Sequence, residues 1–187
     1  MVFLSKIYTK SGDGGDTGLG DGTRVPKDSP RVAASGEVDE LNSTIGLVLA
    51  TCPDPPAADE LRAIQNDLFD VGGDLCFPIV AGETGGLRVT AEQAERLERL
   101  IDRWNEPLEP LRSFVLPGGS AASAWLHLAR TVCRRAERAV VSLGHVEKVN
   151  SHVVIYLNRL SDLLFVLARV ANANGTADVL WVPGRNC

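Results

Sequence analysis

The chain has 187 residues, a length that suits one domain with a core of ordinary size. Its 19 basic and 24 acidic side chains give a formal net charge of −5, whereas nucleic-acid binding needs a basic surface. Hydrophobic residues make up 44%, and no apolar run approaches the ~18 to 20 residues that cross a bilayer, so we expect a globular chain without a membrane span. The first residues lack a signal or transit pattern, which predicts a cytoplasmic location.

The spacing of cysteines and histidines argues against several kinds of site. The cysteines lie far apart with no Cys-x-x-Cys pair, so we expect reduced thiols rather than a zinc site or a redox dithiol. No histidine completes a Glu-x-x-His motif, which excludes a di-iron bundle, and no Gly-x-Ser-x-Gly motif supports acyl transfer. The residues concerned are Cys52, Cys76, Cys133, Cys187, His127, His145 and His152.

Glycine is distributed unevenly along the chain. Seven of the 18 glycines fall between Gly12 and Gly36, whereas the sequence after Gly36 has the apolar spacing of helices. This asymmetry separates a flexible N-terminal segment from a helical remainder. We expect one domain over 1–187, divided into a glycine-rich arm (1–35), a helical bundle (36–174) and a tail (175–187).

The helical region begins with three predicted segments. The first covers about 38–51 and stops before Pro53, because proline cannot continue a helix. The second opens near Asp59, with apolar residues alternately three and four positions apart, the spacing of a helix that packs in a bundle. A Thr-x-x-Gln capping box at Thr90 begins the third segment, which ends before Pro107.

The last two predicted helices are longer. One covers 121–143 after a Pro-Gly-Gly-Ser turn, and we expect Gly144 to cap its C-terminus. The other covers 151–174, with a predicted buried side that includes Ile155 and Val170. Short loops between most of the helices predict an all-α fold, a five-helix antiparallel bundle with the up-down arrangement of ferritin-like proteins.

The glycine-rich segment from Thr9 to Gly22, TKSGDGGDTGLGDG, carries the first pattern with chemical meaning. Its glycines allow backbone N–H groups to converge on an anion, and Lys10 adds a fixed positive charge. The segment matches neither a Walker A loop, a dinucleotide-binding fingerprint nor a calcium loop. It is either a phosphate cradle of another kind, with Lys10 and Lys27 as cations, or a mobile surface hairpin.

Arginines gather on the fourth predicted helix. Arg130, Arg134 and Glu137 are four and three positions apart and therefore share one face, with Arg135 and Arg138 beside them. Guanidinium groups suit a polyphosphate because they bind phosphate oxygens bidentately. The alternative is a solvated helix face held by ion pairs.

Polar residues also interrupt the apolar stripes of the first and fifth predicted helices. Asp39 and Asn42 do so in the first helix, and Asn158 and Asp162 lie one turn apart in the fifth. Such groups are either hydrogen-bonded parts of the fold or members of a site, and we favour the structural role for Asp162.

Six segments of the chain, taken together, resemble the PduO-type ATP:cob(I)alamin adenosyltransferase family. In chain order they are TKSGDGGDTGLGDG, RVPKDSPR, GEVDELNSTIG, FVLPGGS, CRRAER and LNRLSDLLFVLAR, and they span Ile7 to about Arg169. The resemblance implies a homotrimer of five-helix subunits with active sites between neighbouring subunits. It also implies transfer of the 5'-deoxyadenosyl group of ATP to the Co(I) of reduced cobalamin, with release of triphosphate.

The same resemblance assigns roles to individual residues. Arg130 is expected to pair with Asp39 across the subunit interface, and Phe114 to lie beneath the corrin and displace its lower axial base. The implied ligands are ATP, cobalamin and a Mg2+ ion that bridges phosphate oxygens, while the protein ligands of the metal stay unknown. The implied nucleotide-binding residues are Thr9, Lys10, Ser11, Gly12, Thr17, Gly18, Lys27, Arg134, Arg135, Glu137, Arg138 and Asn158.

Two functional classes remain open at the level of sequence. The intact residues Arg130, Asp39, Phe114 and Asn158 favour catalysis. The alternative is a non-catalytic carrier or regulatory trimer that binds ATP and cobalamin, and a reductase or mutase partner is compatible with either class. In the tail, Trp181 either covers the corrin or merely packs.

Overall fold

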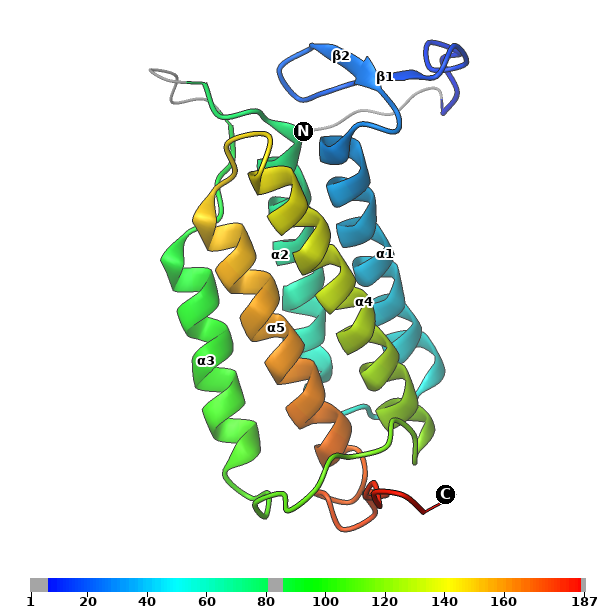
Figure 1. The fold of residues 1–187 in the computed structure, drawn as a ribbon. Coiled ribbons are helices and arrows are strands. Elements are labelled where there is room, and N and C mark those ends of the chain that lie inside the picture. The colour runs from blue at the N-terminus through cyan, green and yellow to red at the C-terminus, as the bar shows by residue number, and fades with distance from the viewer. Residues whose placement is uncertain (1–6, 81–85, 186–187) are drawn as a thin grey trace.

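The computed structural model describes residues 7–80 and 86–185, which contain five α-helices and one two-stranded sheet. Successive helices run in opposite directions, so the fold is the predicted up-down bundle (Figure 1). No helix within the described ranges is long and apolar enough to cross a membrane. The elements are β1 (Asp16–Gly18), β2 (Arg24–Pro26), α1 (Pro30–Thr51), α2 (Ala58–Cys76), α3 (Ala91–Asn105), α4 (Ala121–Gly144) and α5 (Ser151–Val170).

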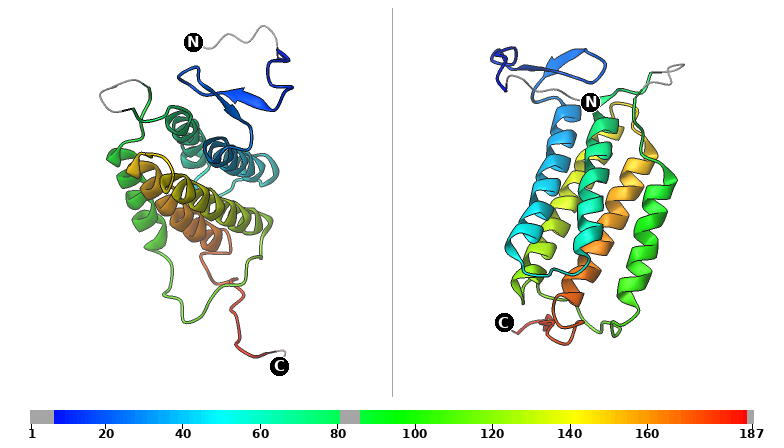
Figure 2. Two further views of the ribbon diagram at one scale, coloured as in Figure 1. Left: turned by 45° about the horizontal axis from the view of Figure 1, so that its top comes forward. Right: turned by 180° about the vertical axis from the view of Figure 1, so that it is seen from behind.

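The core lies along the axis of the bundle, where the apolar stripes of the helices meet. α1 packs against α2 and α4, and α5 packs against α3 and α4 (Figure 2). Each helix contributes a leucine that is buried almost completely, and burial of such a side chain stabilises the fold by about 1.5 to 3 kcal/mol. These five leucines are Leu41, Leu68, Leu97, Leu126 and Leu157.

Two residues predicted for the buried side of α5 are not buried. Ile155 is 39% exposed and Val170 is half-buried, whereas Leu157 and Leu160 are fully buried. Residues two positions apart do not share a helix face, so Ile155 and Leu157 cannot both point into the core.

The helix ends confirm one sequence prediction and correct three. The capping box at Thr90 is present, as predicted. α1 begins earlier than the expected start after Gly36, because Pro30 occupies its first turn, where the missing N–H of proline costs no hydrogen bond. Residues 30–35, which were assigned to the N-terminal arm, are therefore part of α1.

The C-terminal ends of α4 and α5 also differ from the predictions. Gly144 is the last residue of α4 rather than a left-handed cap, and the next residue, His145, closes the helix by donating from its backbone N–H to the carbonyl of Ser142. α5 ends at Val170 rather than near Asn174. After it, Ala173, Asn174 and Gly175 all have positive φ angles (52°, 52° and 81°), which turn the chain away from the helix axis.

The β1–β2 hairpin is docked on the end of α2. The backbone N–H of Gly20 donates to the carbonyl of Cys76 at 2.9 Å. A Cβ atom on Gly20 would lie only 2.4 Å from the ring of Phe77, and one on Gly86 would lie 3.2 Å from the same side chain. Phe77 is therefore held between two glycines, and the hairpin can approach α2 only because residue 20 lacks a side chain.

We expect Gly20→Ala to release the hairpin from α2, because the new methyl group would overlap the ring of Phe77. Amide hydrogen exchange measured by mass spectrometry should become faster over 16–26 and stay unchanged in α4 and α5. Gly14→Ala is the matched control, since no atom lies within 4 Å of a Cβ at that position. Equal exchange in the two variants would contradict the docking contact.

Candidate functional site

The glycine-rich turn before β1 gathers several of the predicted phosphate ligands. Lys10 has a left-handed backbone (φ 61°), and the N–H groups of Asp13 and Gly15 donate to the carbonyls of Lys10 and Gly12 at 3.4 and 3.2 Å. Nζ of Lys27 would lie 3.1 Å from a Cβ on Gly12, so the missing side chain lets the ammonium group lie against the turn. The turn thus places Lys27 beside the glycines of the predicted cradle.

Hydroxyl groups and one further cation complete this turn. Oγ1 of Thr9 and Oγ of Ser11 lie 2.8 Å apart on the surface. Arg24 of β2 donates to the backbone oxygens of Ser11 (2.7 Å) and Asp16 (3.2 Å), which ties the turn to the hairpin. Sequence reasoning did not single out Arg24, although it begins the segment RVPKDSPR. The surface formed by cationic groups and exposed hydroxyls suits an anion such as phosphate.

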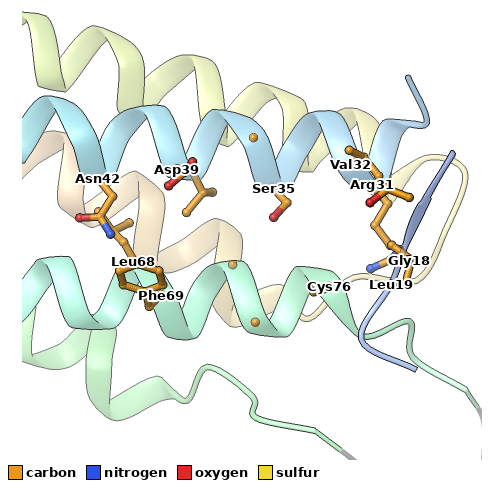
Figure 3. Close-up of a pocket in the computed structure, with 15 residues that line it drawn as sticks. Gly18, Leu19, Arg31, Val32, Ser35, Asp39, Asn42, Leu68, Phe69 and Cys76 are labelled. Atoms are coloured by element: carbon orange, nitrogen blue, oxygen red, sulfur yellow. The ribbon is translucent and has the colours of Figure 1, made fainter. Parts of the chain in front are cut away.

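Thr17 and Gly18 line a second feature, a cleft of about 540 Å³ between α1 and α2 that we call the hairpin cleft (Figure 3). Asp39 and the 73% exposed ring of Phe69 lie along its walls. The carboxylate of Asp39 forms no ion pair with any residue of the described ranges. Four small residues keep the space between the helices open: Ser35, Gly36, Gly72 and Gly73.

One end of the hairpin cleft is fixed by Arg31, which sequence reasoning missed. Its side chain is buried, donates from Nε to Glu147 at 2.8 Å, and donates from a terminal nitrogen to the carbonyl of Leu75 at 2.6 Å. These contacts join the start of α1, the end of α2 and the loop after α4. The spacing of a single arginine in the sequence gives no signal for partners this distant.

The predicted arginines of α4 divide into two groups in space. Arg135 donates hydrogen bonds to Glu40 and Glu37 of α1, and these bonds, first to Glu40 and then to Glu37, raise the pKa of Arg135. Arg134 is exposed and forms no ion pair in the part of the chain that the structure describes. Arg138 donates to the carbonyl of Arg134 at 3.0 Å. Arg135 is therefore engaged within the chain, whereas Arg134 is available to a ligand.

The predicted polar residues of α4 and α5 meet each other. Nδ2 of Asn158 donates to Glu137 at 3.0 Å, and Arg159 donates to Oδ1 of Asn158 at 2.7 Å. Asp162, one turn further along α5, is exposed. The pairing of Asn158 with Glu137 holds two predicted ligands in one fixed arrangement.

Phe114 and Arg130 line a different cleft, of about 900 Å³, that we call the aromatic cleft. Phe114 is 76% exposed, and its ring centre lies 6.0 Å from that of Trp181 at an angle of 58°, a favourable tilted arrangement. Nε of Arg130 is buried without a hydrogen-bond partner in the described structure. Burial lowers the pKa of Arg130, and repulsion from Arg134 lowers it further; among the described residues this cation has no acidic partner.

His127 lies one turn before Arg130 on α4 and is almost completely buried. Neither of its ring nitrogens has a hydrogen-bond partner within the described residues, and the ring of Phe165 lies 6.0 Å away. Burial lowers the pKa of His127, and the nearby charge of Arg130 lowers it further. The folded chain therefore holds this imidazole neutral.

Potential metal ligands and cysteine thiols are dispersed over the described residues. Within 7–80 and 86–185, no group of three or more His, Cys, Asp or Glu side chains could hold a metal ion. Cys52, Cys76 and Cys133 are free, and Cys187 lies outside the described residues. Burial raises the pKa of the Cys133 thiol, which donates to the carbonyl of Leu157, so this thiol is not a reactive nucleophile.

The two clefts lie far apart within one chain. The hairpin covers one end of the bundle, whereas the loop with Phe114 and the C-terminal tail lie at the other end (Figure 1). The 22 residues of α1 rise about 33 Å between these ends. Asp39 and Arg130, the predicted pair, line different clefts and form no ion pair with each other. One chain alone therefore does not bring all the predicted residues to one point.

Comparisons with known proteins bear on this arrangement. A sequence model of the family described as "Cobalamin adenosyltransferase" matches residues 7–171. The chain is 54% identical over 183 residues to a cobalamin adenosyltransferase of Cupriavidus metallidurans, covering 95% of both chains. It is 52% identical over 187 residues to a corrinoid adenosyltransferase of Mycobacterium tuberculosis, covering 98% of this chain and 96% of that protein.

Solved structures show the same similarity. A variant of the PduO-type ATP:corrinoid adenosyltransferase from Lactobacillus reuteri, complexed with cobalamin and ATP, superimposes with a TM-score of 0.89. The two chains are 41% identical, and the alignment covers 97% of each. Another variant of that enzyme, complexed with ATP, gives a TM-score of 0.87 at 40% identity and covers 95% of this chain and 100% of that one.

The neutral state of His127 makes stability depend on pH. In the unfolded chain the histidine has a pKa near 6.5, whereas in the folded chain the pKa of His127 is lower. The unfolded state therefore binds a proton more readily, and the free energy of unfolding should fall as the pH drops below about 6.5. Urea unfolding at about pH 7.5 and about pH 6 measures this slope. We expect His127→Leu to flatten it, and His145→Gln, a change at an exposed histidine, to leave it intact. A wild-type slope in His127→Leu would contradict the assignment.

Proposed function

The chain belongs to the cobalamin adenosyltransferase family, and from this we propose that it transfers the 5'-deoxyadenosyl group of ATP to the cobalt of reduced cobalamin. The similarity to enzymes solved with cobalamin and ATP covers nearly the whole chain and supports both substrates. The observation that carries the proposal is the presence of two half-sites at opposite ends of one subunit. One is the glycine-rich turn before β1, which suits phosphate, and the other is the aromatic cleft.

We propose that the complete site forms between subunits of a homotrimer. Asp39 lacks a cationic partner and Arg130 lacks an acidic partner in the described part of the chain, so a neighbouring copy can satisfy both groups. This pairing would bring the hairpin cleft of one subunit against α4 of the next. A cytoplasmic location and a reductase or mutase partner remain predictions from the sequence.

In this arrangement the turn before β1 holds the triphosphate. Lys10 and Lys27 offset the charge that grows on the leaving group, Thr9 and Ser11 provide hydroxyl hydrogen bonds, and the missing side chain of Gly12 lets Lys27 approach. Thr17 and Gly18 extend this contact into the hairpin cleft.

Residues of α4 and α5 from the neighbouring subunit complete the nucleotide pocket. Arg134 and Arg138 supply guanidinium groups, and the paired side chains of Glu137 and Asn158 supply directional hydrogen bonds. Arg135 acts one step away, because its bonds to α1 hold α4 in place.

The aromatic cleft holds the corrinoid substrate and excludes water. Phe114 would occupy the position of the lower axial base, which leaves cobalt four-coordinate and eases its reduction to Co(I). Co(I) then attacks the 5'-carbon of ATP: the cobalt–carbon bond forms, the carbon–oxygen bond breaks, and triphosphate leaves with the electron pair. No proton moves in this step, so the site needs alignment rather than a general base.

Mg2+ is the remaining implied component. The described residues offer no cluster of metal-binding side chains, so the structure does not fit a resident protein-bound ion. An ion that enters with ATP on its phosphate oxygens would need few or no protein ligands. We assign no step of the reaction to Mg2+.

The direct test mixes the protein with ATP, Mg2+ and chemically reduced cobalamin. We expect adenosylcobalamin and triphosphate in equal amounts, followed by absorbance and chromatography. Binding of both substrates without product would support the non-catalytic carrier instead.

Phe114→Ala separates the two half-sites. We expect the affinity for ATP to stay within about twofold, since Phe114 is not among the proposed nucleotide-binding residues, while turnover falls at least about tenfold. The absorption signature of four-coordinate Co(II)cobalamin should also disappear. Val146→Ala, a change at an exposed apolar residue outside both clefts, is the control. An unchanged signature would refute the placement of Phe114.

Mixed oligomers test whether the site is shared. Asp39→Ala and Arg130→Ala should each be inactive alone. When the two variants are unfolded together and refolded, random pairing should give about a quarter of the interfaces both native residues, and activity should return to about that fraction. Absence of recovery, with assembly intact by light scattering, would mean that Asp39 and Arg130 act within one subunit or not as a pair.

A further inference from the structure

The segment that carries Phe114 is held in place by the C-terminal tail. The N–H of Trp181 donates to the carbonyl of Phe114 at 2.8 Å, and the N–H of Leu116 donates to the carbonyl of Val179 at 2.8 Å. Oγ of Ser113 donates to the carbonyl of Trp181 at 2.7 Å. The loop between α3 and α4 therefore depends on the tail for the position of Phe114.

The tail is in turn anchored by a buried ion pair. Nε of Arg169, near the end of α5, donates to Asp178 at 2.9 Å, and their side chains are only 7% and 2% exposed. Asp178 also accepts a hydrogen bond from Asn172 at 3.2 Å. This pair closes the left-handed turn that follows α5.

Two of these residues, Arg169 and Asn172, hold the two ends of the loop that carries Phe114. Arg169 donates to the carbonyl of Glu109 at 2.9 Å, where the loop begins. Asn172 donates to the carbonyl of Gly118 at 3.2 Å and accepts from the N–H of Ser120 at 3.0 Å, where the loop ends and α4 begins. One buried polar cluster thus fixes the tail and the loop relative to α5.

The cluster leaves no space for a side chain at two neighbouring glycines. A Cβ on Gly119 would lie 2.3 Å from Oδ1 of Asn172, and one on Gly175 would lie 2.9 Å from a guanidinium nitrogen of Arg169. Both glycines have positive φ angles, 96° and 81°. The backbone on both sides therefore packs directly against the cluster.

We propose that Arg169 and Asp178, with Asn172, are positioning residues that set Phe114 and Trp181 in the aromatic cleft; the catalytic part of this inference rests on the proposed function. A buried ion pair contributes little net stability compared with apolar side chains of similar volume, but it demands a defined geometry. Here that geometry is passed through backbone hydrogen bonds to the two aromatic residues. The pair is thus better suited to orienting the cleft than to stabilising the bundle.

The double variant Arg169→Met, Asp178→Leu tests this role, because apolar replacement of a buried pair generally preserves folding. We expect a thermal midpoint and an ATP affinity close to those of the wild type. Amide exchange at Leu116 and Trp181, followed by NMR, should become at least about tenfold faster, and the KM for cobalamin should rise by a similar factor. Arg62→Met, which removes an exposed ion pair with Asp59, is the control for loss of an arginine.

Each outcome separates the positioning role from its alternatives. Unchanged exchange together with an unchanged KM for cobalamin would overturn the proposal, as would a loss of ATP binding equal to the loss of cobalamin binding, which indicates a general structural role. The single variant Asp178→Asn provides a second test if the double variant fails to fold, with the same expected loss of protection. If the wild type makes no adenosylcobalamin, the proposed function fails, whereas the exchange measurement still decides whether the ion pair orders the loop.

Discussion

The length of the bundle is the constraint on which the placement of every functional group depends. α4 has 24 residues and rises about 36 Å, so groups at its two ends cannot act on the same atoms. Transfer between two substrates requires reacting atoms about 3 to 3.5 Å apart. This fold places the glycine-rich turn before β1 at one end and Phe114 at the other. It is therefore suited to side-by-side association, in which segments at different heights along neighbouring bundles come together.

Two buried carboxylates on α2 make the bundle rigid enough for this arrangement. Asp67 accepts from the hydroxyl group of Tyr156 at 2.9 Å and bonds to Arg96, which links α2 to α5 and α3. Burial, with the nearby charge of Asp67, raises the pKa of Tyr156, so its hydroxyl remains a donor. Asp74, near the C-terminal end of α2, accepts hydrogen bonds from Arg88 and other donors. These contacts fix which helices are neighbours and where each helix lies along the bundle axis. Apolar packing alone specifies both only loosely.

Periodic and local features of the sequence were predictable, whereas long-range partners were not. Apolar spacing located all five helices, and the capping box at Thr90 marked the start of α3, because both depend on residues within a few positions. Arg135 shows the limit: its place among the arginines of α4 left a phosphate ligand and an ion-paired helix face both open, and nothing in the sequence indicated that its acidic partners come from α1. The ion pair of Arg169 with Asp178 gave no sequence signal either, since it depends on a left-handed turn after α5.

The groups without partners are more informative about function than the paired ones. Most charged side chains near the core, such as Arg31 and Arg169, have an acid and a carbonyl within reach. Arg130 does not, although leaving a buried polar atom unpaired costs about 1 to 3 kcal/mol. Arg130 lines the aromatic cleft on α4, and Asp39, which lines the hairpin cleft on α1, forms no ion pair within the described residues. In the proposed trimer, a neighbouring Asp39 would give Arg130 the acidic partner that it lacks among the described residues, so formation of the interface would also complete the site.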